Sequence, residues 1–212
     1  MDKNTAMVRA VVDAAKSKPP EFLRSEVRYL ALVSNDICSL DEAHELLGLC
    51  KNLVGFSALY KFTALALLPI LTGIRVAQLG ICLGELFRGS KFDLAYPSFE
   101  TITHLNIFDG VDTKGIERLC PQLAMLPALT HLALDRRWPR DVLMEVLDMC
   151  PRLMLLSIFE RDEKAEYRSA RVPFVYDARF VIVLYPNFYD CWNDWENGTN
   201  GLSDVGPGRS VL

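Results

Sequence analysis

A short apolar pattern recurs along this chain and constrains its fold more than any other feature. In each copy, apolar residues take the first, fourth and sixth places of L-x-x-L-x-L, as in Val27-Arg-Tyr-Leu30-Ala-Leu32. Seven copies begin at positions 27, 53, 74, 102, 129, 153 and 180, so neighbouring copies start 21 to 28 residues apart. Leucine-rich repeats have a period of about 20 to 29 residues. The recurrence therefore predicts a leucine-rich-repeat solenoid with about seven short parallel strands.

The pattern also assigns a role to each part of a repeat. Alternate side chains of a strand point to opposite faces, so the marked residues fill the interior and the residues between them line a concave sheet. The segments between strands, such as Leu40–Cys50 and Arg140–Cys150, place apolar residues at helical spacing. One repeat cannot bury its own leucines, whereas stacked repeats bury them continuously. We therefore expect an α/β solenoid with helical or irregular segments on the convex side.

The ends of such an array need covering, because an open last repeat exposes core and unpaired strand edges. Residues 1–20 are expected to form an N-terminal capping helix, with the amphipathic stretch at Thr5–Lys16. The repeats are expected to fill residues 21–197, and the aromatic-rich stretch 185–195 would cover the last strand. Residues 198–212, rich in Gly, Ser and Asn, predict a flexible tail.

Charge and hydropathy argue against several classes of protein. Twenty-seven acids against 23 bases give a net charge of -4, which does not favour nucleic-acid binding. The most apolar stretch, Ala64–Leu86, is interrupted by Pro69, Arg75 and Gln78, so no membrane span is expected. The N-terminal residues do not resemble a secretory signal, which predicts a cytoplasmic or nuclear protein whose six cysteines stay reduced.

Two histidines share a position in neighbouring repeats. His104 and His131 both occupy the third place of their copy, and adjacent strands lie about 4.8 Å apart, so the two imidazoles should stand side by side. A metal ion would need a third ligand, and the neighbours expected in the same column are Val76 and Leu155, so no metal site is predicted.

No set of residues suggests catalysis. Cys50 and Cys150 fall in an apolar register at helix ends, where a thiol is buried and inert. The glycines at 80, 84 and 89 do not form a phosphate-binding loop, and no carboxylate pair has a telling spacing. We therefore expect no catalytic residues, no cofactor and no enzymatic activity.

The concave surface is where function is expected. Its third, fifth and seventh positions combine aromatic and polar side chains, the mixture that protein interfaces favour. The predicted partner-binding residues are Tyr29, Gln78, His104, Asn106, Phe108, His131, Asp135, Leu155 and Phe159.

Three stretches carry a resemblance to a known family. Phe99–Asp109, Leu126–Asp135 and Cys150–Leu153 resemble the leucine-rich-repeat region of F-box-type proteins that are numerous in mushroom-forming fungi. The resemblance implies an N-terminal F-box that docks to a ubiquitin-ligase scaffold and repeats that present a target for ubiquitination. The residues ahead of the first repeat lack the Leu-Pro-x-Glu-type segment of an F-box, so this chain departs from the family at the part that would bind the scaffold.

Together these features predict a non-enzymatic module that binds a protein through its concave face, derived from a ligase substrate receptor without its F-box. One alternative is a truncated structural remnant that has no partner. Another is an enzyme on a different fold. The spacing of the two histidines separates these: if His104 and His131 lie far apart, the repeat register is wrong and the enzyme hypothesis gains support.

Overall fold

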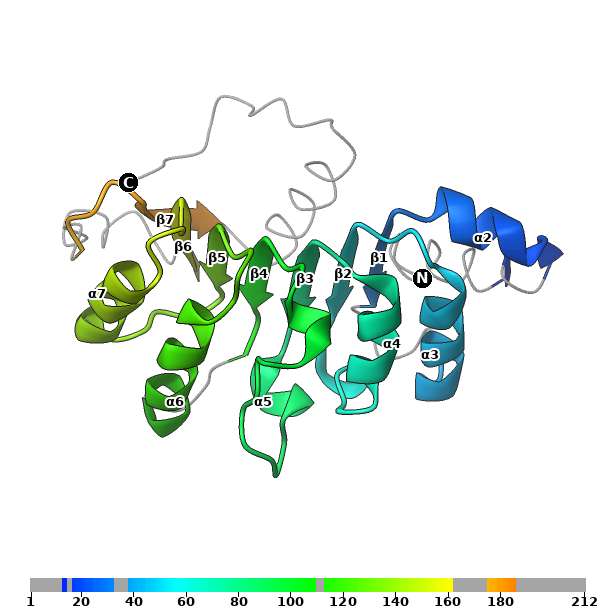
Figure 1. Cartoon of the computed structure of the whole chain (residues 1–212), viewed down its shortest axis with the longest axis horizontal. Helices are drawn as coiled ribbons and strands as arrows, with labels where there is room; N and C mark the ends of the chain where they lie inside the picture. Colours follow the sequence, from blue (N-terminus) through cyan, green and yellow to red (C-terminus); the bar gives the residue numbers. More distant parts are fainter. Residues whose placement is uncertain (1–12, 15–16, 33–37, 110–112, 162–174, 186–212) are drawn as a thin grey trace.

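A seven-stranded parallel sheet forms one side of the protein. The computed structural model describes residues 13–14, 17–32, 38–109, 113–161 and 175–185. The strand order in the sheet is the order in the sequence, so each strand pairs with the one before it and the one after it (Figure 1). The sheet is open, with β1 and β7 at its two edges. Its strands are β1 Tyr29–Leu32, β2 Gly55–Ala58, β3 Gln78–Ile81, β4 His104–Ile107, β5 His131–Leu134, β6 Leu155–Arg161 and β7 Phe180–Tyr185.

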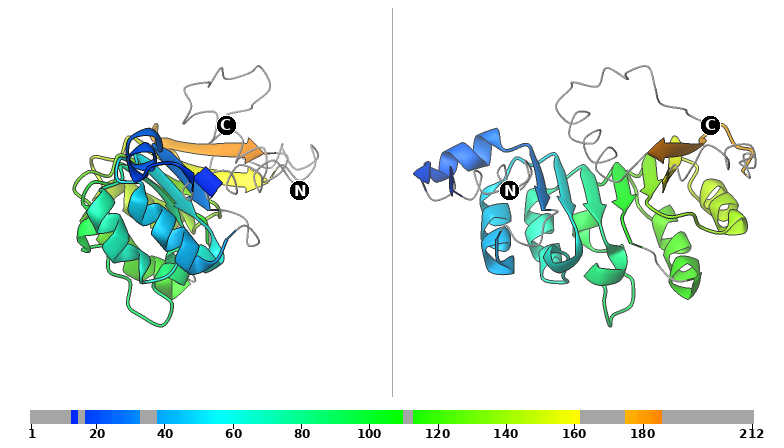
Figure 2. Two further views of the ribbon diagram at one scale, coloured as in Figure 1. Left: turned by 90° about the vertical axis from the view of Figure 1, so that its right-hand side faces the viewer. Right: turned by 180° about the vertical axis from the view of Figure 1, so that it is seen from behind.

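Helical segments connect the successive strands from β1 to β6, and α3 to α7 lie along one side of the sheet in both perpendicular views (Figures 1 and 2). None of the helices in the described ranges has the length and apolar character needed to cross a membrane. The helical elements are α2 Pro20–Glu26, α3 Leu40–Leu49, η1 Tyr60–Phe62, α4 Leu67–Ile74, α5 Leu83–Leu86, η2 Pro97–Phe99, α6 Thr113–Ala124 and α7 Arg140–Met149.

The core lies between the sheet and these helices. In β4 and β5 the second and fourth residues are buried, and the first and third are more exposed. Because successive strand residues point to opposite faces, one residue in two faces the helices throughout the sheet. The helix-facing side chains of adjacent strands pair directly, as Leu105 pairs with Leu132 and Ile107 with Leu134. These apolar columns join the strands into one continuous core.

The ends of two helices follow from local chemistry. Ser39 caps α3: its hydroxyl accepts a hydrogen bond from the Glu42 amide, and the Glu42 carboxylate accepts one from the Ser39 amide. Helix α4 ends at Arg75, which adopts the left-handed conformation with φ 60°. The helices predicted over Leu40–Cys50 and Arg140–Cys150 are confirmed as α3 and α7.

The predicted register is wrong at the third strand. The sequence places a strand start at Ile74, but Ile74 is the last residue of α4, and β3 begins at Gln78. Val76, Leu79 and Ile81 are the buried set, because the chain turns at Arg75 before it extends. Ile74/Ala77/Leu79 and Val76/Leu79/Ile81 both match the apolar pattern, so the pattern alone does not separate them.

The register of the last strand also differs from the prediction. The sequence pattern gives Phe180 the first place of its copy. In the structure Phe180 pairs with Leu156, which has the fourth place of the preceding copy, so the two registers disagree. The buried residues of β7 are consequently Phe180, Ile182 and Leu184, and Val183 faces the other way. Helix α2, which begins at Pro20, was not predicted.

The predicted ends of the chain are mostly outside the described residues. Within the expected capping helix, Asp13 and Ala14 are helical, and the rest of its N-terminal half lies outside the described ranges. The expected aromatic cap after residue 185 and the tail at 198–212 also lie outside them.

Candidate functional site

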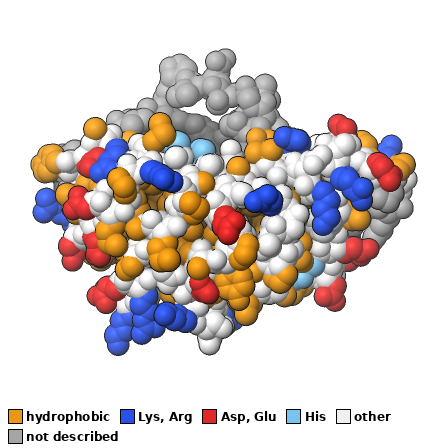
Figure 3. Space-filling model, viewed as in Figure 1, with side chains coloured by type: hydrophobic (Ala, Val, Ile, Leu, Met, Phe, Trp, Pro, Cys, Tyr) orange, Lys and Arg blue, Asp and Glu red, His pale blue; other side chains and the backbone are white. Residues whose placement is uncertain are grey.

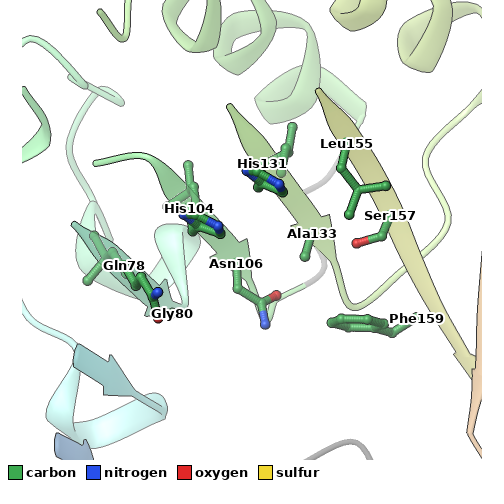
Figure 4. A pocket seen from close by; sticks show the side chains of 12 residues that line it. Gln78, Gly80, His104, Asn106, His131, Ala133, Leu155, Ser157 and Phe159 are labelled. Atoms are coloured by element: carbon green, nitrogen blue, oxygen red, sulfur yellow. The ribbon is translucent and has the colours of Figure 1, made fainter. Parts of the chain in front are cut away.

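The face of the sheet opposite the core carries a hollow of about 210 Å³. We call this face the polar face; it is formed by the strand residues that alternate with the core residues, such as His104 and Asn106 of β4. The hollow lies over β3 to β6 (Figure 4). Its lining residues are Gln78, Leu79, Gly80, His104, Leu105, Asn106, His131, Leu132, Ala133, Leu155, Ser157 and Phe159.

The strand register arranges these residues in rows that run across the sheet. One row consists of Gln78, His104, His131 and Leu155, each paired with the next. The second row consists mostly of small side chains, and Phe159 lies on its other side. The first row and Phe159 therefore flank a lower floor (Figure 4). The floor residues are Gly80, Asn106, Ala133 and Ser157.

The imidazoles of His104 and His131 stack in the first row. Their ring centroids are 4.1 Å apart and their planes differ by 4°. The two residues are direct register partners in adjacent parallel strands, which is why the rings lie face to face. This adjacency was predicted from the repeat positions and is confirmed.

A threonine hydroxyl lies behind each ring. The hydroxyl of Thr103 lies 3.0 Å from the Ala77 carbonyl oxygen, and that of Thr130 lies 3.1 Å from the Thr103 carbonyl oxygen. Each hydroxyl oxygen also lies 2.8 Å from the Nδ1 of the following histidine. Each Nδ1 therefore has a partner within the protein, and Nε2 is the ring nitrogen that remains for a ligand.

Burial lowers the pKa of His104, and the neighbouring His131 lowers it further. The charged form loses hydration in the stack, and a second positive charge 4.1 Å away would repel it. His104 is consequently neutral at neutral pH.

Two aromatic side chains of the polar face fold onto glycines instead of lining the hollow. A Cβ at Gly55 would lie 2.7 Å from the Tyr29 ring, and a Cβ at Gly80 would lie 2.7 Å from the Phe108 ring. Both glycines are buried by these contacts, although they belong to the polar face. Because glycine has no side chain, each ring can pack against the neighbouring strand, and a larger residue in place of the glycine would displace the ring.

Asp135 lies one row beyond the floor. Its amide donates to the Ile107 carbonyl (3.0 Å), so the parallel ladder continues past Leu134. Leu134 pairs with Ile107 and Ile158, which places Asp135 between Phe108 and Phe159. Burial raises the pKa of the Asp135 carboxyl to about 6, against the opposing effect of Arg136.

Arg137 and Asp109, two other charged residues near this end of the strands, have partners of their own. Arg137 Nε lies 2.6 Å from Glu160 Oε1. The Asp109 carboxylate accepts a hydrogen bond from the Gly84 amide at the start of α5. Burial raises the pKa of Asp109 even though this and other backbone hydrogen bonds oppose the rise. Asp109 therefore has a structural role, because it satisfies a helix terminus.

The structure brings most of the predicted partner-binding residues together. Tyr29, Phe108 and Asp135 do not line the hollow, although all three belong to the polar face. The sequence predicts that Val76 lies beside His104 on the concave face, and this prediction is wrong. Val76 is fully buried, and Gln78 pairs with His104 instead. The predicted residues that do line the hollow are Gln78, His104, Asn106, His131, Leu155 and Phe159.

Sequence reasoning missed part of the floor of the hollow. Gly80 and Ala133 are not among the predicted concave-face residues, whereas Ser157 has the fifth place of its copy and is expected on that face; small side chains at this repeat position create the depression. Small size at the fifth place of consecutive repeats is the signal that could have located it. In the part of the chain that the structure describes, no three His, Cys, Asp or Glu side chains are grouped to hold a metal ion.

The buried cysteines are expected to be unreactive in the folded protein. Burial raises the pKa of Cys50 to about 11 and that of Cys120 to about 12. At pH 8 the thiolate of Cys50 is then about 100-fold scarcer than in an unfolded chain, and the thiolate is the nucleophile. We expect iodoacetamide to leave Cys50, Cys82, Cys120 and Cys150 unmodified until the protein is unfolded, as measured by peptide mass spectrometry. Rapid labelling of Cys50 in the native protein would contradict its burial.

The side of the protein in Figure 3 carries charged groups of both signs, interspersed without a large area of one sign. The sequence matches no model of a known protein family, and no curated protein matches it. The geometry of the polar face is therefore the basis for assigning a function.

Proposed function

We propose that this chain is a leucine-rich-repeat solenoid that binds a protein partner on its polar face and catalyses no reaction. The main support is the pairing of His104 with His131 at the same repeat position, above a hollow lined by four consecutive strands. The support from the fold is a set of parallel strands in sequence order, with β1 to β5 each followed by an outer helical segment at a period in the twenties, which is what a leucine-rich repeat would produce.

The composition of the hollow favours a protein ligand. It combines apolar groups of Leu155 and Phe159 with amides and imidazoles, and such mixed surfaces are typical of the centre of protein interfaces. Because the hollow lies on strands and not on loops, it is held rigidly, and little ordering entropy is lost on binding. The resemblance to F-box-type proteins would make this surface the target-binding part of a former ligase receptor.

The proposal is tested by selecting binders from a phage-displayed library of random twelve-residue peptides on the full chain. We expect selected peptides to bind the wild type at least tenfold more tightly than the double variant His131→Lys/Leu155→Lys. Both substitutions lie on the polar face, outside the core.

A matched control places two lysines on the helical side. Met125 is 69% exposed and Met149 38% exposed, so Met125→Lys/Met149→Lys adds the same charge away from the hollow. This control should bind the peptides like the wild type. Peptides that bind both double variants equally would move the site away from the polar face, and failure to enrich any peptide would favour a structural remnant with no partner.

A further inference from the structure

An unsatisfied hydrogen-bond acceptor lies in the lining of the hollow. The Nδ1 atoms of His104 and His131 contact threonine hydroxyls, so their Nε2 atoms are the ring nitrogens left for a ligand. The side-chain oxygen of Asn106 is buried and has no hydrogen-bond partner. A buried acceptor without a partner is costly, and a donor from a ligand would remove that cost.

Among the described residues that line the hollow, none is Lys or Arg. A cationic ligand therefore meets no like-charged side chain in the lining, and an anionic ligand would find no counter-charge there.

The far side of the hollow supplies a flat apolar surface and a carboxylate. Phe159 presents its ring beside the floor residues Ala133 and Ser157 (Figure 4). The next row places Asp135 between Phe159 and Phe108. Among the described residues no hydrogen bond or ion pair engages the Asp135 carboxylate, whereas Arg137 is held by Glu160. The Phe108 ring folds toward Gly80 on the other side, so the ring of Phe159 is the aromatic surface for an organic cation beside this carboxylate.

We infer that the hollow is a subsite for an arginine side chain of the protein partner, whose aliphatic stem passes His104 and His131 and whose guanidinium lies beside Phe159 and reaches the Asn106 side-chain oxygen and Asp135. This inference rests on the proposed function and specifies its ligand chemistry. The planar guanidinium has five donors spread around its edge and can stack on a ring, so it suits several separate acceptors beside Phe159. A lysine ammonium is compact and offers three donors from one point. The net charge of -4 on the chain also favours a basic partner.

The three histidines of the chain allow a direct test by NMR. The probes are four acetylated and amidated pentapeptides, Gly-Gly-X-Gly-Gly, in which X is arginine, lysine, citrulline or glutamate. Citrulline has the shape of arginine without its charge. Imidazole resonances of the full chain are followed during titration; His104 and His131 report on the hollow, and His44 on helix α3 is the internal control.

We expect the arginine peptide to shift the His104 and His131 resonances and to leave those of His44 unchanged. Its half-saturating concentration should be about tenfold lower than that of the citrulline or lysine peptide, the ratio expected for one charge-assisted hydrogen bond. In Asp135→Asn the preference for arginine over citrulline should fall to about twofold or less. Asp141→Asn, which removes an exposed carboxylate from α7, should keep the preference.

Three results would overturn the arginine subsite. These are equal binding of arginine and citrulline, equal binding of arginine and lysine, and the absence of any shift at His104 and His131. Displayed peptides that lack arginine but still depend on His131 and Leu155 would also overturn it, and they would leave the proposed function intact.

Discussion

Replacing Phe99 with alanine is expected to lower the free energy of unfolding by about 3–5 kcal/mol. Phe99 is fully buried at the end of η2, and its ring stacks with that of Phe87 at a centroid distance of 6.5 Å. The outer segment between β3 and β4 contains little helix, since α5 has four residues and η2 has three. Phe87 and Phe99 supply much of the filling there, so the cavity left by truncation has few neighbours that can relax into it.

Urea denaturation followed by circular dichroism would measure this loss. Met125→Ala is the control, since Met125 is 69% exposed and should change the stability by less than about 0.5 kcal/mol. A loss below about 1 kcal/mol for Phe99→Ala would show that the segment between Leu83 and Phe99 packs less tightly than its burial indicates. Because typical domains are stable by about 5–15 kcal/mol, the expected loss would be a large part of the total.

The sequence predicts the parallel α/β arrangement well because the apolar triplets are spaced by one repeat. Where helix and strand signals are distinct, as at α3 and α7, the boundaries agree with the structure to within a residue. The register fails where an apolar helix runs directly into a strand, as α4 does at Ile74. There the left-handed Arg75 sets the boundary, and a single non-glycine residue of that conformation has no clear sequence signal.

The sequence predicts which residues of the candidate site lie side by side on neighbouring strands, but it does not predict the hollow between them. Position in the repeat is enough to pair His104 with His131, because register is a property of the backbone ladder. Whether an aromatic side chain lines a hollow or covers a glycine depends on the neighbouring strand. Phe108 and Gly80 are 28 positions apart, and their contact arises from packing that no local pattern encodes.

Asp135→Asn is expected to stabilise the protein at neutral pH by about 1 kcal/mol, which would raise the melting temperature by about 2–4 °C. Burial raises the pKa of this carboxyl from 3.8 to about 6, so keeping it ionised costs folding free energy. A shift of this size corresponds to about 3 kcal/mol, and we reduce it because the side chain is partly exposed and water screens its charge. Thermal melts of wild type, Asp135→Asn and the control Asp141→Asn at pH 7.5 would measure the gain.

The pH dependence of that gain distinguishes it from a packing effect. The folded state holds the proton more tightly than the unfolded state, so the destabilisation is complete above about pH 6–7 and is lost as the pH falls toward 4. The charged groups closest in sequence and register, Arg136, Arg137 and Glu160, are present in both proteins, and so is His131 on the same strand face. The difference between wild type and Asp135→Asn should therefore disappear near pH 4, and an equal gain at both pH values would contradict the electrostatic explanation.

A carboxylate that lowers stability at neutral pH and has no ion-pair partner among the described residues is more easily explained by binding than by folding. If Asp135→Asn is both more stable and less able to prefer arginine over citrulline, the same charge accounts for both results. The loss of binding could not then be attributed to unfolding. Acidification should weaken arginine binding in the wild type as well, because Asp135 loses its charge below about pH 6 and protonation of His104 makes it a cation. Stability and arginine binding should therefore change in opposite directions when Asp135 is neutralised, whether by mutation or by acid.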